Sequence, residues 1–392
     1  MRILHVIEGL DPELGGLSRA VTSLCEATAA SGTEVEIITT TRQPNTNLFE
    51  PIGVKVQALP QRFCSAWSYA PSLSQVMKDA VVTADLVHLH GLWLYPHFVA
   101  SRAAWQSRKP YVVSPHGMLN RWALSQAAFK KRVYANLIEW RTLRRAATIH
   151  AVSESEARDI RQLGFCAPLV TIPNGISPGE FSNLPKRSLF RRKYPMLAGK
   201  TVLLFLGRIH PKKGLDLLVR SFCRVTKECP GTVLVVAGPE ERGYQKHLQS
   251  RLHAEGFLNR CIFTGMLQPA ERLAALAGAD IFVLPSYSEG FPIAPIEALA
   301  AGLPVILTEA CNIPEIEEEG AGLVITAELG SLTEAMLRLI NNPALRRQMG
   351  LKGRHLALTR YNWDRVAARM TQVYENVLLH EKAEYPTQAQ FA

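Results

Sequence analysis

The chain has 392 residues and a formal net charge of +10, with 47% hydrophobic and 20% charged residues. This length exceeds that of an ordinary single domain and suits two domains, each with its own core. No stretch approaches the roughly 18 uninterrupted apolar residues of a membrane-spanning helix. The opening segment MRILHVIEGL is too short and too polar for a signal peptide, and seven scattered cysteines without a CxxC pair favour reduced thiols over a disulfide framework or a zinc site. The composition therefore predicts a cytoplasmic protein.

Short apolar runs alternate with helical patterns along the first half of the chain. Helices are predicted at Gly16–Ala30 and Ala127–Ala146. Because strands that alternate with helices form parallel sheets covered on both faces, this half predicts a doubly wound α/β domain. The expected strands are Ile3–Ile7, Val35–Thr39, Leu86–Leu89, Tyr111–Ser114, Thr148–Val152 and Leu169–Ile172.

The same alternation restarts after a polar and basic stretch, NLPKRSLFRRKYPMLAGK, which is typical of a linker. A second doubly wound domain is therefore predicted. The expected boundaries are a first domain at 1–182, a linker at 183–199, a second domain at 200–360, a last helix at 361–380 and a polar tail at 381–392. The expected strands of the second domain are Thr201–Leu206, Val233–Ala237, Ile262–Thr264, Ile281–Leu284, Val305–Leu307 and Gly322–Ile325.

Open parallel sheets bind ligands beyond the carboxyl ends of their strands, so the active site is expected between the two domains, among polar residues that directly follow strands. The segment GRIHPKKG follows the strand TVLLFLG and places Arg208 and Lys213 at the start of a helix expected from Leu215. A helix N-terminus with two cations suits a diphosphate, which must leave as an anion. The alternative is a pair of solvated loop cations.

The segment YSEGFPIAPIEALAAGLPVI follows the strand ADIFVLPS and carries Glu289 in the loop. Glu297 lies about one turn into a helix that begins near Pro292 or Pro295. A glutamate in an otherwise apolar helix needs a partner. Two ribose hydroxyls would serve, and a structural salt bridge is the alternative. The backbone amides of residues 290–293 would hold phosphate or sugar oxygens at the helix start.

Two places in the first half also follow strands. Gly15 and Gly16 permit close approach of the backbone to a phosphate, although a plain loop is the alternative. His116, in VVSPHGM, would orient the transferring sugar or the acceptor, and His90, in HLHGLW, is placed similarly. For both histidines, a packed or surface side chain is the alternative.

Several familiar motifs are missing from the sequence. Its seven aspartates never form an Asp-x-Asp pair, which is the usual carboxylate pair for a metal that bridges a nucleoside diphosphate. No metal and no separate cofactor are therefore expected, and Arg208, Lys213 and helix dipoles would stabilise the departing diphosphate. The absence of a Walker-type loop and of GxGxxG argues against a phosphoryl-transfer enzyme or a dehydrogenase.

The basic excess is concentrated at residues 121–145, where seven Lys and Arg residues stand against one acid, Glu139, and alternate with aromatic and aliphatic residues. The spacing suits a helix with a basic and an apolar side. One interpretation is an ordinary surface helix, and the other is a helix that rests on anionic lipid head groups. Nucleic-acid binding is not expected, because no recognition motif accompanies the charge.

Taken together, the motifs resemble the retaining glycosyltransferases of family 4, which have the two-domain GT-B fold. The resemblance covers nearly the whole chain and rests on the order and spacing of the motifs. They are Gly15-Gly16 after the first strand, SPHGM, AVSESEARDI, IPNGI, GRIHPKKG, AGPE, FTGML, EGFPIAPIE and a closing YNWDRVAARMTQVYENV, which looks like the final helix that crosses back to the first domain in this family.

The resemblance implies a role for each site residue. Arg208 and Lys213 would bind the donor diphosphate, and Glu297 would bind the donor ribose. Gly16 would approach the diphosphate from the opposite side. Glu289 and His116 are the expected catalytic groups, beside the sugar and the acceptor. The backbone bordering the sugar would be that of Gly290, Phe291, Pro292 and Ile293, and the nucleobase region would comprise Gly238, Glu240, Gly265, Met266 and Leu267.

Two departures from the family pattern are present. The chain has Gly-Phe-Pro-Ile at 290–293 where the family often has Gly-Phe-Gly-Leu, and Ser177 replaces the usual acid after Asn174-Gly175. The mechanism implied is transfer with retention of configuration. Because no carboxylate is placed as a covalent nucleophile, we expect a front-face route in which the leaving diphosphate oxygen helps to deprotonate the acceptor hydroxyl.

The sequence thus predicts transfer of a sugar from a nucleotide-diphosphate sugar to a saccharide acceptor. The basic, aromatic segment 121–145 favours a lipid-linked acceptor at the inner face of a bacterial membrane, in exopolysaccharide or lipopolysaccharide synthesis. Two alternatives remain open. A nucleotide-sugar epimerase of the same architecture would give a product without acceptor, whereas a non-catalytic basic protein would bind RNA or lipid in a salt-dependent way.

Overall fold

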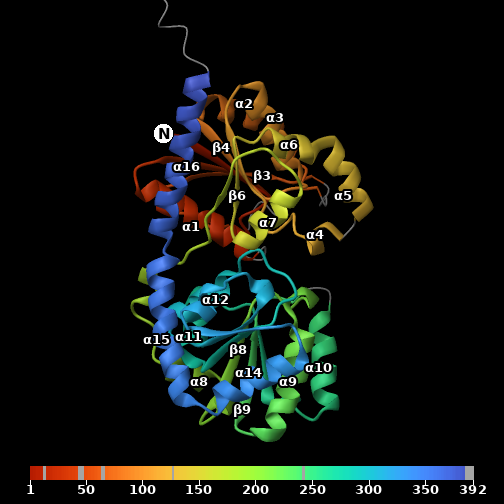
Figure 1. Cartoon of the computed structure of the whole chain (residues 1–392), viewed down its shortest axis with the longest axis vertical. Coiled ribbons are helices and arrows are strands. Elements are labelled where there is room, and N and C mark those ends of the chain that lie inside the picture. The colour runs from red at the N-terminus through yellow and green to blue at the C-terminus, as the bar shows by residue number, and fades with distance from the viewer. Residues whose placement is uncertain (12–14, 43–47, 63–66, 126–127, 241–242, 385–392) are drawn as a thin grey trace, which may run out of the picture. The chain divides into compact units, whose positions relative to one another are not determined.

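The computed structural model describes residues 1–11, 15–42, 48–62, 67–125, 128–240 and 243–384. The chain divides into two compact units (Figure 1). The first contains residues 1–175 together with the chain from Trp363 onward, and the second contains Ile176–Asn362. None of the helices in the described part of the chain is long and apolar enough to cross a membrane.

The first unit is built on a seven-stranded sheet with the order β3-β2-β1-β4-β5-β6-β7, in which every pairing is parallel. Its central strands are buried along their whole length, as expected for a sheet covered on both faces. The strands are β1 (Arg2–Ile7), β2 (Glu34–Thr41), β3 (Lys55–Pro60), β4 (Leu86–His90), β5 (Tyr111–Ser114), β6 (Thr148–Ala151) and β7 (Leu169–Thr171).

Helices pack on this sheet through a large apolar cluster that includes Val6, Ile38, Val87 and Leu89. The C-terminal helix α16 lies beside α1 in Figure 1 and belongs to this unit. The helices are α1 (Gly16–Ala30), α2 (Leu73–Thr83), α3 (Tyr95–Gln106), α4 (Arg121–Ser125), α5 (Ala128–Tyr134), α6 (Trp140–Arg144), α7 (Glu154–Gln162) and α16 (Trp363–Glu384), with a π-helical segment at Ala135–Glu139.

The second unit has a six-stranded parallel sheet with the order β10-β9-β8-β11-β12-β13. Its strands are β8 (Thr201–Leu206), β9 (Thr232–Ala237), β10 (Cys261–Gly265), β11 (Ile281–Leu284), β12 (Val305–Thr308) and β13 (Gly322–Ile325). Its helices are α8 (Ser188–Lys193), α9 (Leu215–Glu228), α10 (Tyr244–Ala254), α11 (Pro269–Gly278), α12 (Ile293–Ala300), α13 (Glu315–Glu318), α14 (Leu329–Ile340) and α15 (Pro343–Arg360). The predicted fold class, two Rossmann-like doubly wound domains, is confirmed.

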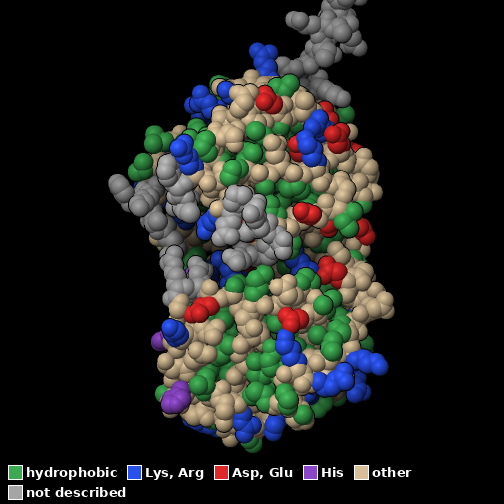
Figure 2. All heavy atoms as spheres, turned by 180° about the vertical axis from the view of Figure 1, so that it is seen from behind, with side chains coloured by type: hydrophobic (Ala, Val, Ile, Leu, Met, Phe, Trp, Pro, Cys, Tyr) green, Lys and Arg blue, Asp and Glu red, His purple; other side chains and the backbone are tan. Residues whose placement is uncertain are grey.

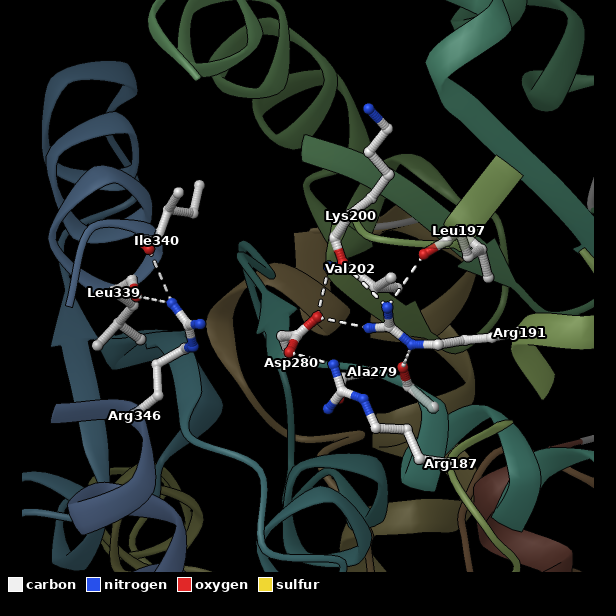
Figure 3. A network of polar contacts seen from close by, with 11 residues as sticks. Arg187, Arg191, Leu197, Lys200, Val202, Ala279, Asp280, Leu339, Ile340 and Arg346 are labelled. Carbon is white, nitrogen blue, oxygen red and sulfur yellow. Dashed lines mark hydrogen bonds and ion pairs between the residues drawn. The ribbon is translucent and has the colours of Figure 1, made fainter. Parts of the chain in front are cut away.

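The predicted linker at 183–199 requires correction, because this stretch is folded into the second unit. Phe190 and Leu197 are buried. Arg187 and Arg191 both reach Asp280, over 2.5 and 2.7 Å, and Arg191 also donates to three backbone carbonyl groups (Figure 3). The chain passes between the two units twice. The first boundary follows Gly175, and the second lies between Asn362 and Trp363. The basic composition of this stretch suggested a linker, but two of its arginines, Arg187 and Arg191, form ion pairs with Asp280, which lies about ninety residues later in the chain.

The third arginine labelled in Figure 3 binds the end of a helix. Arg346 donates to the carbonyl groups of Leu339 and Ile340 at the C-terminus of α14, over 2.6 and 2.8 Å. The last carbonyl groups of a helix have no partner within it, and a cation there also complements the helix dipole. Part of the basic excess of the chain therefore serves local structure.

Two further elements differ from the sequence expectations. The strand β3 was not predicted, because KVQALP at the edge of the sheet has only Leu59 buried. The helix predicted at Ala127–Ala146 consists of α5, the π-helical segment and α6, while residues 126–127 lie outside the described part. A π-helical turn shifts the side-chain register, so the regular spacing of basic and apolar residues does not give two continuous sides.

Candidate functional site

Three loops of the second unit meet at the carboxyl ends of β8, β9 and β10. The Gly207 amide donates to the carbonyl of Ala237, and the Gly238 amide donates to that of Gly265, each over 2.9 Å. A Cβ atom on Gly238 would lie 2.0 Å from the Gly207 carbonyl oxygen, so only glycine permits this approach. Gly238 and Gly265, predicted for the nucleobase region, therefore lie against the loop predicted for the diphosphate.

The other residues of the predicted nucleobase region lie on the same loops. Glu240 forms a parallel bridge with Ile209, which follows Arg208. Met266 is 41% exposed and Leu267 is half-buried. An exposed methionine beside bare backbone gives an apolar surface of the kind on which a planar base stacks.

Lys213 and Glu289, predicted from separate motifs, are in direct contact. Lys213 Nζ lies 2.7 Å from Glu289 Oε1, and the Ser286 hydroxyl donates to the same oxygen over 2.6 Å. Burial raises the pKa of Glu289, but the charge and hydrogen bond of Lys213 outweigh it, so the net shift is downward and the carboxylate is ionised. Arg208, on the same loop as Lys213, is exposed to solvent.

The backbone before α9 explains how Lys213 reaches Glu289. Residues Pro211–Lys213 form a 3-10 turn, and Gly214 then adopts a φ of +68°. A Cβ atom at Gly214 would lie 1.9 Å from the Pro285 carbonyl oxygen, so the turn packs directly against the chain that leaves β11. Glycine is required here for both its conformation and its size.

The loop that carries Glu289 is held by Asn312, which the sequence analysis did not single out. The Asn312 side-chain amide donates to the Glu289 carbonyl over 2.8 Å and to the Gly290 carbonyl over 3.3 Å. Asn312 itself has a φ of +60°, which asparagine tolerates better than most residues. The loop then enters α12 at Ile293, with Pro292 as its N-cap and Phe291 buried before it.

Glu297 has the partner that an apolar helix demands. Its Oε1 atom accepts a hydrogen bond from Arg272 Nη1 over 2.6 Å, and the same guanidinium reaches Glu180 over 2.9 Å. Arg272 and Glu297 are 7% and 3% exposed, so this is a buried ion pair. The salt bridge considered in the sequence analysis is therefore present, and the role of Glu297 toward a ribose stays a prediction.

In the first unit, His116 follows β5 with a φ of +52°, a strained conformation for a residue other than glycine. Its Nε2 atom lies 3.1 Å from Nδ1 of His90, which ends β4. The two histidines considered in the sequence are therefore hydrogen-bonded to each other. Both line a small pocket of about 10 Å³, with His150 and residues of α1 and α16.

Glu156 holds the turn after His116 and was not predicted. Its two carboxylate oxygens accept from the Gly117 and Val152 amides, over 2.5 and 2.8 Å. The sequence Ser153-Glu-Ser-Glu156 at the start of α7 has the form of a capping box, but the Glu156 side chain serves these two loops instead. Burial raises the pKa of Glu156 to about 7, against the effect of both amides.

Four more buried polar groups surround His90. His88 lies between the Tyr374 hydroxyl and the Ser114 hydroxyl, at 2.7 Å from each. Ser114 contacts His150 over 2.7 Å, and His150 reaches the Ile172 carbonyl over 2.7 Å. This chain joins α16 to three strands of the sheet. Burial lowers the pKa of His88 and of His150, so both side chains are neutral at pH 7.

His5, His88 and His90 offer nitrogen atoms within 4.8 Å of one another and form the one group of potential metal ligands found in the described part of the chain. The geometry does not fit a metal. His5 Nδ1 and His90 Nε2 are 2.8 Å apart, which is a hydrogen-bond distance. Two nitrogen ligands of one tetrahedral zinc ion would be about 3.3 Å apart.

The remaining predicted positions lie at the surface of the first unit. Gly16 is the first residue of α1, is exposed, and has open space where a Cβ atom would be. In segment 121–145, Val133 and Leu137 are 45% and 72% exposed, and Arg132 and Arg144 are also exposed. The side chains of Arg121 and Lys130 lie outside the described residues.

Two family descriptions match the chain in succession: Glycosyl transferase 4-like domain over residues 15–175 and Glycosyl transferases group 1 over residues 186–356. The chain belongs to the GT-B glycosyltransferases of the family-4 type. The predicted family is thereby confirmed. The two matches meet between residues 175 and 186, close to the division between the two units.

Curated relatives of this glycosyltransferase align over almost its whole length. It is 28% identical to a phosphatidyl-myo-inositol mannosyltransferase of Mycobacterium leprae over 374 residues, which cover 93% of each chain. It is 27% identical over 391 residues to a GDP-mannose:cellobiosyl-diphosphopolyprenol alpha-mannosyltransferase of Xanthomonas oryzae, covering 96% of this chain and 97% of the relative.

Solved structures show the same fold at lower identity. HepE from Anabaena, in complex with UDP and glucose, superposes with a TM-score of 0.80 at 21% identity, over 96% of this chain and all of the other. WaaG, a glycosyltransferase involved in lipopolysaccharide biosynthesis, superposes with a TM-score of 0.73 at 18% identity, over 95% of this chain and 99% of the other.

Proposed function

We propose that this glycosyltransferase transfers a sugar from a nucleoside-diphosphate sugar to a saccharide acceptor with retention of anomeric configuration. The observation that carries the proposal is the Lys213–Glu289 contact in the second unit. It joins the loop after β8 to the loop after β11, beside Arg208 and the start of α9. An ionised pair with a second cation and a helix N-terminus suits a leaving diphosphate.

The geometry favours a front-face route over a covalent intermediate. Glu289 is held by Lys213 and Ser286 through the same oxygen, which suits a residue that orients Lys213 and a sugar hydroxyl. In this route the diphosphate oxygen accepts the acceptor proton as the glycosidic bond breaks, and Arg208 and Lys213 stabilise the charge that develops on the diphosphate. Isolation of a glycosyl adduct on Glu289 would contradict this route.

A thermal-shift screen against nucleoside-diphosphate sugars tests donor binding. At a hundredfold excess over the dissociation constant, a true donor should stabilise the protein by about 2.7 kcal/mol. Arg208→Ala should abolish the shift, whereas Arg224→Ala, which removes an exposed arginine of α9, should preserve it. A full panel without any shift would refute the proposed donor site.

The proposed acceptor is a lipid-linked saccharide, used in bacterial exopolysaccharide or lipopolysaccharide synthesis at the inner face of the membrane. The support is segment 121–145, where the exposed Val133 and Leu137 lie among the exposed cations Arg132 and Arg144. Apolar groups surrounded by cations suit an anionic lipid surface. Two curated relatives are also named for lipid-linked acceptors.

Vesicles of phosphatidylglycerol and phosphatidylcholine test this surface. Replacing Lys130, Lys131 and Arg132 by Glu should abolish binding to the anionic vesicles. The matched control replaces Lys246 and Arg251, on α10 of the second unit, by Glu and should leave binding unchanged. Equal binding of both variants would exclude the membrane hypothesis.

On the face of the molecule in Figure 2, Lys and Arg side chains lie in separate small groups, the largest at the lower right, among apolar, acidic and uncharged groups. The positive charge of this face is therefore not arranged as a nucleic-acid surface, which requires a stripe or a patch of cations. The proposal assigns the chain a sugar donor and a saccharide acceptor, and it includes no nucleic acid because no recognition motif accompanies the basic segment 121–145.

A further inference from the structure

Fixed acceptors determine which nitrogen carries the proton in three buried histidines of the first unit. His97 Nε2 lies 2.8 Å from the His90 carbonyl oxygen, and His150 Nε2 lies 2.7 Å from that of Ile172. A carbonyl oxygen only accepts, so both histidines carry their proton on Nε2. His150 Nδ1 is then an acceptor for the Ser114 hydroxyl.

The same logic extends to His88. Because Ser114 donates to His150, its oxygen must accept from His88 Nε2, at 2.7 Å. His88 Nδ1 is then bare and accepts from the Tyr374 hydroxyl. His88, His97 and His150 are therefore all Nε2–H tautomers, and the Tyr374–Ile172 chain has one direction only.

A second chain contains His5, His90 and His116. His5 Nδ1 lies 2.8 Å from His90 Nε2, and His90 Nδ1 lies 3.1 Å from His116 Nε2. Burial lowers the pKa of all three, so each imidazole is neutral at pH 7 and carries one proton. Two bonds that share the middle ring must run in the same direction, which leaves two arrangements for the whole chain.

The two arrangements differ at the ends. In one, His5 keeps a bare Nε2 and His116 presents Nδ1–H; in the other, His5 keeps Nε2–H and His116 presents a bare Nδ1. His5 is fully buried, and its Nε2 has no hydrogen-bond partner among the described residues. Among buried backbone groups, orphaned N–H groups are rarer than under-satisfied acceptors. The same preference applied to the imidazole ring favours the first arrangement.

His97 shows which end the protein leaves without a partner. Its Nε2 must carry the proton, so its buried, unpartnered Nδ1 is a bare nitrogen. The first unit thus contains one buried ring nitrogen that can only accept and has no partner, at His97, seven residues after His90. The first arrangement leaves the same kind of atom at His5.

We propose that His5 and His90 are positioning residues that hold His116 as the Nδ1–H tautomer, so that His116 presents a hydrogen-bond donor to the substrate at the carboxyl end of β5. In this arrangement His5 donates a hydrogen bond to His90, and His90 donates one to His116. His116 then donates to a sugar or acceptor oxygen and does not act as a base. The assignment of a sugar or acceptor oxygen as the partner of His116 rests on the proposed sugar transfer. The assignment of the tautomers does not.

The test is nitrogen-15 NMR of the full chain with labelled histidine at pH 7.5, in which two-bond couplings distinguish protonated from bare ring nitrogens. The expected pattern is Nδ1–H for His5, His90 and His116, and Nε2–H for His88, His97 and His150. Single substitutions assign the signals. The second group is an internal control, because a misfolded first unit would lose its pattern as well.

Two variants at His5 test whether the hydrogen bonds from His5 through His90 determine the tautomer of His116. His5→Leu removes the donor to His90, so the Nδ1–H fraction of His116 should fall and kcat should fall with it, by up to about tenfold, at unchanged donor KM. His5→Asn supplies an amide N–H near the position of Nδ1 and should restore both readouts. A merely structural role would move stability without the tautomer of His116.

An Nε2–H signal for His116 in the wild-type protein would overturn the proposal. So would one equivalent of zinc that removes the His5 and His90 signals together and is not taken up by His5→Asn, since the group would then be a metal site. A protein with the expected tautomers but without sugar transfer to any acceptor would refute the proposed function and leave the relay standing.

Discussion

The two units bury polar groups near their strand ends in different ways. In the first unit, five histidines, a serine and a tyrosine form chains of neutral hydrogen bonds from His5 to His116 and from Tyr374 to Ile172, and a sixth, His97, donates to the His90 carbonyl. In the second unit, the corresponding groups are ion pairs, Lys213–Glu289, Arg272–Glu297 and Arg191–Asp280. Both arrangements pair most of their buried polar atoms at pH 7, but by different chemistry.

The difference suits the proposed division of labour. A leaving diphosphate carries negative charge, so the second unit, which is proposed to bind the sugar donor, needs cations held in place by buried acids. A neutral sugar hydroxyl requires no opposite charge, so uncharged donors and acceptors such as buried imidazoles are sufficient to bind it. The same difference predicts that protons should perturb the first unit and that loss of a single charge should perturb the second.

Acid should have the largest effect, and it should act on the first unit. The pKa of each of the six histidines lies below its unfolded value of 6.5 because of burial, so their contribution to stability is complete above pH 6.5 and is lost as the pH falls. Because six buried groups lose this contribution over the same range, a large loss of stability is expected between pH 7.5 and 5.0.

Two buried glutamates oppose that loss. Burial raises the pKa of Glu139 and Glu156 to about 7, so the folded state gains stability as the pH falls from 7 toward 4.5. Two groups gain stability where six lose it, so a net loss of stability is expected over the same range.

Urea unfolding followed by tryptophan fluorescence measures this net loss in the first unit alone. All six tryptophans lie there: Trp67, Trp93, Trp105, Trp122, Trp140 and Trp363. An unfolding free energy that stays constant between pH 7.5 and 5.0 would show that the histidines are not neutral in the folded state.

Removal of one buried charge should have the next largest effect, in the second unit. Arg272→Met leaves Glu297 buried without its partner and should cost about 3–5 kcal/mol. The double variant with Glu297→Leu should recover most of that loss, because both charges are then absent. Hydrogen exchange of peptides from the second unit provides the measurement, and a double variant no more stable than the single one would contradict the pairing argument.

The segment at 183–199 provides a smaller and more local test. Asp280→Asn removes the charge that Arg187 and Arg191 share and should cost about 2–3 kcal/mol, with faster hydrogen exchange confined to residues around 187–202. Lys193→Gln, which breaks an exposed pair with Glu271, should leave stability nearly unchanged, because solvent screens a pair at the surface. Similar effects of the two variants would mean that the segment behaves as the linker that its sequence suggests.

Apart from the Lys193→Gln control, the smallest expected effect is that of Tyr374→Phe in the first unit. The change leaves His88 Nδ1 buried without a donor and should cost about 1–2 kcal/mol by tryptophan-detected unfolding. Because His88 is neutral either way, the slope of stability against pH should stay as in the wild type. A steeper slope would indicate that the hydroxyl also governs the charge of His88.

Much of the donor loop could be recognised from the sequence because its chemistry is local. Gly207, Arg208, Lys213 and Gly214 lie within eight residues, and both glycines have positive φ angles, which favour glycine whatever the distant contacts. Glu297 could be identified as needing a partner from its apolar helix alone. Its partner Arg272 could not, because α11 shows no motif around that arginine.

Only some members of the histidine chains could be predicted from the sequence. His90 and His116 follow strands directly and were therefore candidates, whereas His5 lies within a strand and Tyr374 lies in a helix 286 residues from His88. Glu156 was hidden by a sequence that fits a capping box. Asn312 was hidden because its side chain serves a loop more than twenty residues earlier in the chain.

The sequence by itself determined the two parallel sheets and their helices, since buried strands and amphipathic helices follow from the local order of apolar residues. It also determined the family, through motifs in a given order and spacing. Only the tertiary structure decided which polar groups meet, whether the basic stretch at 183–199 is a linker, and which nitrogen of each histidine carries a proton. The reason is physical: hydrophobic periodicity is read along the chain, whereas ion pairs and hydrogen bonds join atoms that the fold brings together from distant positions.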